Sequence, residues 1–135
     1  VDAEGNIEPM RSSARHSTGM EPNSAFSLYV TIDDYPKFLL NILREPDFAA
    51  RVRSVRNTAG NGVEWGLGWG LYNERLWHWG DNGGFKSLVC LDPATRDALL
   101  IHTNGFNGLN VCYAVAEHVT GESFKDIAEM VEGVE

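Results

Sequence analysis

The sequence predicts an α+β fold, in which an antiparallel β-sheet is flanked by α-helices. Strand-like segments follow one another through residues 63–104 and are joined by short turns, so neighbouring strands must pair antiparallel. Segments with apolar residues at helical spacing come before and after them, in residues 24–58 and 105–132. The 135 residues are enough for one domain with one core.

The first part of the chain predicts a loop and then two helices. Residues 1–23 are polar and lack periodicity, which indicates an extended loop. A helix is expected from Thr31, because Thr31 and Asp34 resemble a capping box ahead of a run of apolar residues at helical spacing. Pro46 favours the start of a second, shorter helix, and residues 57–62 are expected to end it.

Four strands are expected next. In residues 65–71 bulky apolar side chains alternate with glycine, which predicts one strand with a side-chain-free face that another element can approach closely. The other three strands are expected at residues 76–80, 85–91 and 98–103, with a turn after Asp92.

Two helices and two cysteines complete the expected core. The first of these helices ends at Gly121 and the second covers residues 123–131. The apolar face of the first carries Leu109, Cys112, Val115, Ala116 and Val119. Cys90 and Cys112 lie in apolar contexts, which favours two buried free thiols, with a disulfide as the alternative.

Composition excludes several classes of function. A formal net charge of -8 repels phosphate backbones, so no nucleic-acid partner is expected. No apolar run approaches the roughly 20 residues of a membrane helix, so no membrane segment is expected in this chain. The histidines lack metal-site spacing, so no metal or cofactor is expected; they are His16, His78, His102 and His118. The cellular compartment is left open.

Residues 78–85 are the unusual element of the sequence. His78 stands at the end of an aromatic strand and is followed by a turn rich in glycine, which leaves backbone N–H groups accessible to a ligand. Such groups can form an oxyanion hole. The alternative is an ordinary hairpin turn beside a half-exposed histidine. His102 is expected in the core, and Trp77 and Trp79 in the core or in a cleft wall.

These residues resemble the third motif of the beta-lactamase and penicillin-binding-protein superfamily of serine hydrolases. His78-Trp-Gly80 matches a Lys/His-x-Gly motif on a sheet strand, and Gly84-Phe85 matches the extension found in family esterases. Asp81 and Gly83 depart from the common choices. Further stretches follow the order of the family, at residues 27–34, 66–69 and 92–104.

The resemblance implies that residues 1–135 are the C-terminal portion of a beta-lactamase-like (DD-peptidase) fold. It implies an esterase, amidase or D-amino-acid peptidase that acts through an acyl-serine. His78, Gly80 and Asp81 are the implied site residues, with the backbone N–H of Asp81 as an oxyanion donor. Many relatives carry lysine at the position of His78, and a partly charged histidine weakens the case for beta-lactam hydrolysis.

The motifs that carry the nucleophile in this family are absent from the chain. No serine is followed three residues later by lysine, and there is no Tyr-x-Asn. The chain alone is therefore expected to be inactive. Its expected partners are the missing N-terminal half of the same protein and a small-molecule ester, amide or peptide substrate, with a homo-oligomer as a further expectation. The alternative is a non-catalytic binding or interaction module of the same fold.

Overall fold

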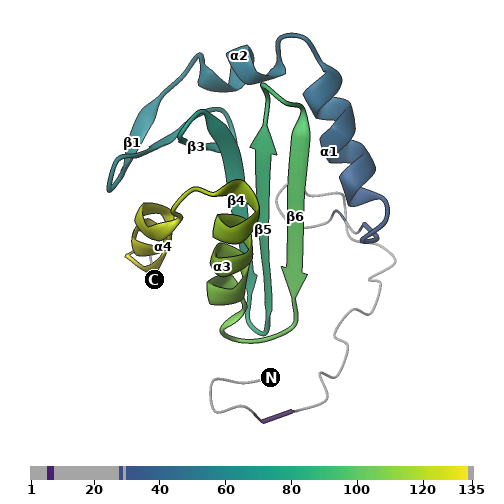
Figure 1. The fold of residues 1–135 in the computed structure, drawn as a ribbon, viewed down its shortest axis with the longest axis vertical. Coiled ribbons are helices and arrows are strands. Elements are labelled where there is room, and N and C mark those ends of the chain that lie inside the picture. The colour runs from purple at the N-terminus through teal and green to yellow at the C-terminus, as the bar shows by residue number, and fades with distance from the viewer. Residues whose placement is uncertain (1–5, 8–27, 29, 134–135) are drawn as a thin grey trace, which may run out of the picture.

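A computed structural model describes residues 6–7, 28 and 30–133. Its elements are α1 (Tyr35–Arg44), α2 (Phe48–Arg53), β1 (Asn57–Gly60), β2 (Val63–Trp65), β3 (Gly70–Tyr72), β4 (Arg75–Asn82), β5 (Phe85–Asp92), β6 (Asp97–Thr103), α3 (Gly108–Thr120) and α4 (Lys125–Glu132). The strands form one six-stranded sheet in chain order, and each pair of neighbours is antiparallel (Figure 1). The predicted α+β class is confirmed.

Two hydrophobic clusters cover opposite faces of the sheet, because successive strand residues point to opposite sides. On the face covered by α3 and α4, here the α3 face, the buried residues include Trp77, Leu88, Cys90, Cys112 and Ala116. On the face covered by α1 and α2, here the α1 face, they include Leu39, Leu43, Leu76, Val89 and Leu91. Both cysteines are buried and free, as predicted.

The single strand predicted for residues 65–71 is wrong. The segment contains the end of β2, a tight turn and the start of β3, and these two strands pair with each other. In the turn the Gly66 N–H donates to the Trp69 carbonyl over 2.8 Å, and Gly68 has φ of +74°. Glycine reaches this left-handed region without a steric cost, so the glycines mark a turn here and not a continuous strand.

Other parts of the chain nevertheless lie very close to these glycines. A Cβ atom on Gly66 would lie 2.3 Å from the Val52 carbonyl oxygen, and the Leu67 N–H donates to that oxygen over 3.0 Å. A Cβ atom on Gly70 would lie 2.3 Å from the Trp77 indole. The missing side chains therefore let α2 approach the turn between β2 and β3, and let the Trp77 ring of β4 lie against Gly70 of β3.

The sheet begins earlier than residue 63. Residues 57–62, expected only to end a helix, form β1 and the turn that returns the chain into β2. Gly60, Asn61 and Gly62 all have positive φ, which closes a hairpin. The break in helical periodicity was thus also the start of a strand.

Two helices differ in detail from the prediction. The Thr31 hydroxyl donates to the Asp34 carboxylate over 2.7 Å and accepts from the Asp34 N–H over 3.2 Å, but α1 starts after this turn, at Tyr35. In α3, Val115 and Val119 are exposed and do not belong to the buried face. That face comprises Gly108, Cys112, Tyr113 and Ala116. No helix in the described ranges is both long and apolar enough to span a bilayer.

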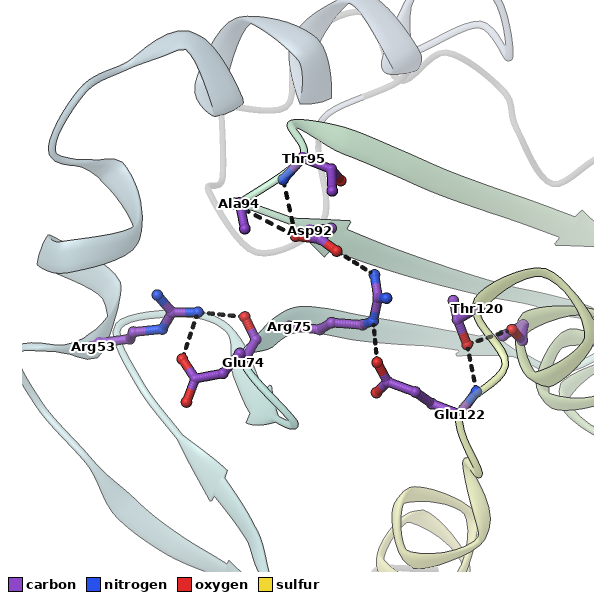
Figure 2. A network of polar contacts seen from close by, with 9 residues as sticks. Arg53, Glu74, Arg75, Asp92, Ala94, Thr95, Thr120 and Glu122 are labelled. Atoms are coloured by element: carbon purple, nitrogen blue, oxygen red, sulfur yellow. Dashed lines mark hydrogen bonds and ion pairs between the residues drawn. The ribbon is translucent and has the colours of Figure 1, made fainter.

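An arginine clamp fixes the first residue of β4 (Figure 2). The Arg75 side chain donates from Nε to Glu122, between α3 and α4, over 2.9 Å. It also lies 2.9 Å from the Asp92 carboxylate, at the end of β5. Nearby, Arg53 of α2 pairs with Glu74 in the turn before β4. These contacts join the sheet to segments on both of its faces at the Arg75 end of β4.

Candidate functional site

The second half of β4 has an open edge. β3 pairs with β4 only from Arg75 to Trp77, whereas β5 pairs along β4 as far as Asn82. From His78 onward, no described strand pairs with β4 on the side of β3. The predicted site residues lie in this half of the strand.

The register of the β4–β5 hairpin decides which backbone groups face that edge. A two-residue loop joins Asn82 to Phe85. The two residues that flank a loop of this length form a hydrogen-bonded pair, in which each N–H donates to the carbonyl of the other residue. The pattern alternates, so Gly80 also bonds to β5, whereas Asp81 and Trp79 direct their backbone groups to the open edge. The N–H of Asp81 therefore points away from the sheet, directly after Gly80.

His78 lies at the same edge and is exposed. Its Nδ1 is 2.6 Å from the Trp79 carbonyl oxygen, and because a carbonyl can only accept, Nδ1 carries the proton. In the neutral ring Nε2 is then an acceptor. The ring centroid is 5.3 Å from that of Trp65 and 5.4 Å from that of Trp79. Two indoles thus hold the imidazole beside the strand edge.

The two tryptophans of β4 lie where the sequence placed them. Trp77 is fully buried in the core of the α3 face, and Trp79 is half-buried against the same cluster. Both pack on the α3 face of the sheet.

A groove of about 480 Å³ opens beside the β4–β5 hairpin. Its floor contains Gly80, Ser87 and His102, which lie opposite one another on β4, β5 and β6. Its apolar walls are formed by Val30, Ile32 and Phe85, all of them partly exposed. A Cβ atom on Gly80 would lie 2.5 Å from the Ser87 hydroxyl oxygen, so glycine leaves room for that hydroxyl above the strand.

The prediction that His102 is a core residue is wrong. His102 is exposed on β6, and its ring centroid is 6.5 Å from that of Tyr35. Leu100 packs against the cluster beneath α1, whereas His102 and Thr103, further along β6, line the groove. His118 is exposed on α3. Within the described ranges, no three His, Cys, Asp or Glu side chains gather into a group that could hold a metal ion.

Sequence reasoning missed Lys86, which lies across the hairpin from Asp81. It is 7% exposed, and it is the one charged residue among the buried residues of the described part of the chain. Its ammonium group donates to the Asp81 carboxylate and lies 5.2 Å from the centroid of the Phe106 ring. The period of two along β5 was an available signal, because it places Lys86 on the same face as Leu88 and Cys90.

A family model described as beta-lactamase matches residues 5–114 of the chain. The match covers α1, α2, all six strands and the first half of α3, and so includes the open edge and the groove. No curated protein and no solved structure matches the chain significantly.

Proposed function

The chain belongs to the beta-lactamase family, and we propose that it forms the sheet-side wall of a serine-hydrolase active site whose attacking serine lies outside residues 1–135. One observation carries the proposal. The Asp81 N–H follows the motif glycine Gly80 and points to an open sheet edge beside a groove.

The reaction proposed is acyl transfer to serine followed by hydrolysis. The serine attacks the carbonyl carbon of an ester or amide, the leaving group departs, and water then cleaves the acyl-serine. Negative charge develops on the carbonyl oxygen during both attacks, and the N–H of Asp81 donates a hydrogen bond to that oxygen. The second donor is the N–H of the attacking serine itself, so this chain supplies half of the oxyanion hole.

The groove favours neutral substrates. Its walls are apolar, and the lysine among its described lining residues is already paired with Asp81. His78 is exposed beside it, and because its Nδ1–H is already donated to the Trp79 carbonyl, it offers a substrate carboxylate fewer donors than the ammonium group of a lysine would. We therefore propose an esterase, amidase or D-amino-acid peptidase in preference to a beta-lactam hydrolase.

The test is an assay of a polypeptide in which this chain follows its natural upstream segment. p-Nitrophenyl esters, D-amino-acid amides and a chromogenic cephalosporin are the substrates. We expect turnover of esters or amides to exceed that of the cephalosporin, and no turnover by the 135-residue chain alone. If the longer polypeptide contains the serine motif and turns over none of these substrates, catalysis is excluded.

The second candidate is a non-catalytic binding module. The absence of Ser-x-x-Lys from the chain favours it, because the groove could bind a ligand without any nucleophile. An upstream segment that lacks the serine motif, combined with saturable binding of an ester analogue to the chain alone, would support this function over hydrolysis.

A further inference from the structure

We propose that Lys86 is a positioning residue: from the α3 face of the sheet, it fixes the direction in which the Asp81 N–H points at the open edge. The catalytic meaning of this inference rests on the proposed function. The structural part concerns an ion pair between the buried Lys86 and the partly exposed carboxylate of Asp81 within one hairpin, and it can be tested separately.

The register brings the two side chains together. Asp81 of β4 lies directly opposite Lys86 of β5. Hydrogen-bonded and non-hydrogen-bonded pairs alternate along the two strands, and since Asn82 and Phe85 form a hydrogen-bonded pair, Asp81 and Lys86 form a pair without backbone hydrogen bonds to each other. Side chains approach most closely in such pairs. The Asp81 backbone thus has no ladder bonds to β5, and the ion pair to Lys86 is the contact that ties this residue to the neighbouring strand.

Lys86 is itself held from several sides. The Thr103 hydroxyl donates to the Lys86 carbonyl over 3.3 Å, and the Phe106 ring lies beside the ammonium group. The start of α3 packs closely against Thr103 and Lys86. A Cβ atom on Gly108 would lie 1.8 Å from the Thr103 hydroxyl oxygen and 3.0 Å from the Lys86 Cβ. The backbone and Cβ of Lys86 are therefore held against β6 and the start of α3, and its ammonium group lies against Phe106.

The burial of Lys86 restricts the position of the Asp81 side chain. A buried ammonium group is costly when unpaired, so Lys86 keeps the Asp81 carboxylate in contact. The ion pair lies beside Phe106 and Leu109, on the α3 face, whereas the floor of the groove is on the α1 face. Lys86 and Asp81 also border the groove, but their charged groups pair on the α3 face, so the role proposed for Lys86 is exerted through the backbone of Asp81.

The first test uses the 15N-labelled 135-residue chain. We compare Lys86→Met, which keeps the aliphatic stem, with Lys125→Met, which breaks an exposed ion pair to Glu129. The order parameter of the Asp81 N–H should fall from about 0.85 toward 0.6 in Lys86→Met only, while that of Leu88 stays unchanged. An unchanged value at Asp81, or an equal fall in Lys125→Met, would overturn the proposal.

A second variant covers the case in which Lys86→Met does not fold. The double variant Lys86→Met/Asp81→Asn leaves no unpaired buried charge, so the hairpin keeps its packing. The N–H at position 81 should still become more mobile, and an order parameter equal to that of the natural chain would contradict the inference.

The catalytic consequence is tested in the longer polypeptide with its upstream segment. There Lys86→Met should lower kcat by about tenfold to a hundredfold with KM within about twofold, because a misdirected donor acts mainly in the transition state. An unchanged kcat would overturn the catalytic part. If the natural sequence has no activity, the proposed function fails, and the order parameters alone decide whether Lys86 positions Asp81.

Discussion

At the scale of single residues, Cys90 gives the molecule a defined dependence on pH. Burial raises the pKa of the Cys90 thiol to about 12, from its ordinary 9.0. The folded chain therefore keeps a proton that the unfolded chain releases above 9.0. The stabilisation is complete below that pH and is lost as the pH rises toward about 12.

We predict that the free energy of unfolding contains a Cys90 contribution that falls by about 1.4 kcal/mol per pH unit within this window. Urea titrations from about pH 8 to about pH 10.5 measure the slope. Cys90→Ala is less stable throughout, but its stability should fall less steeply over this range. Parallel curves for the two proteins would show that Cys90 does not carry the effect.

Gly70 gives a prediction based on packing. A Cβ atom there would lie 2.3 Å from the Trp77 ring, which is fully buried and so cannot turn out into solvent. Gly70→Ala should lower the free energy of unfolding by about 1–3 kcal/mol. Gly105→Ala is the matched control, because nothing lies within 4 Å of its Cβ position, and it should stay within about 0.5 kcal/mol. Equal stabilities of the two variants would contradict the packing argument.

The sequence predicted the positions of some site residues in the fold but not those of others. The sequence placed His78 on a strand because that signal is local, but it ended the strand at Gly80, whereas β4 continues through Asp81 to Asn82 and the turn is limited to Gly83 and Gly84. Lys86 escaped notice because its burial depends on Phe106 and the start of α3, far along the chain. The position of His102 was wrong because the extent of β6 covered by α1 is a tertiary property that strand hydrophobicity does not report.

At the scale of elements, long regular segments were predictable and short ones were not. β5, β6 and α4 follow their periodicity closely. β2 and β3 have three residues each, too few for a period to be read, and the glycines between them mimic the alternation of a strand. β1 is defined by its pairing with β2 and not by a pattern of its own.

The arginine clamp predicts how α4 is attached to the sheet. Arg75→Met should lower the free energy of unfolding by about 1–3 kcal/mol, between the values for exposed and buried ion pairs, because its partners Asp92 and Glu122 are both largely buried. Urea unfolding of Arg75→Met and of the exposed control Lys125→Met gives the comparison. The control should change by less than about 0.5 kcal/mol. A loss no larger than that of the control would show that the clamp does not stabilise the fold.

At the scale of the whole molecule, short connections made the architecture predictable. Antiparallel strands in chain order need only tight turns, so the sheet topology follows from the spacing of the strands. Which surfaces stay uncovered depends on the lengths of the helices and could not be derived. Among the residues that the structure describes, apolar side chains stay exposed on the walls of the groove and along a stripe on α3 formed by Val111, Val115 and Val119.

We predict that the isolated chain self-associates through the walls of the groove, where an open sheet edge adjoins apolar side chains. Ile32→Ser in the groove should shift sedimentation toward the monomer, whereas Val119→Ser on the α3 stripe should not; both side chains are at least 60% exposed. If only the α3 variant dissociates the assembly, the groove is not the surface through which the chain associates.

The most direct test of the account removes a single backbone N–H. In the longer polypeptide with its upstream segment, Asp81→Ala and Asp81→Pro both lose the ion pair to Lys86, but only proline lacks the N–H that faces the open edge. We predict that kcat of Asp81→Pro is lower than that of Asp81→Ala by about two to three orders of magnitude. Equal kcat values in two folded variants would contradict the claim that this N–H stabilises the oxyanion.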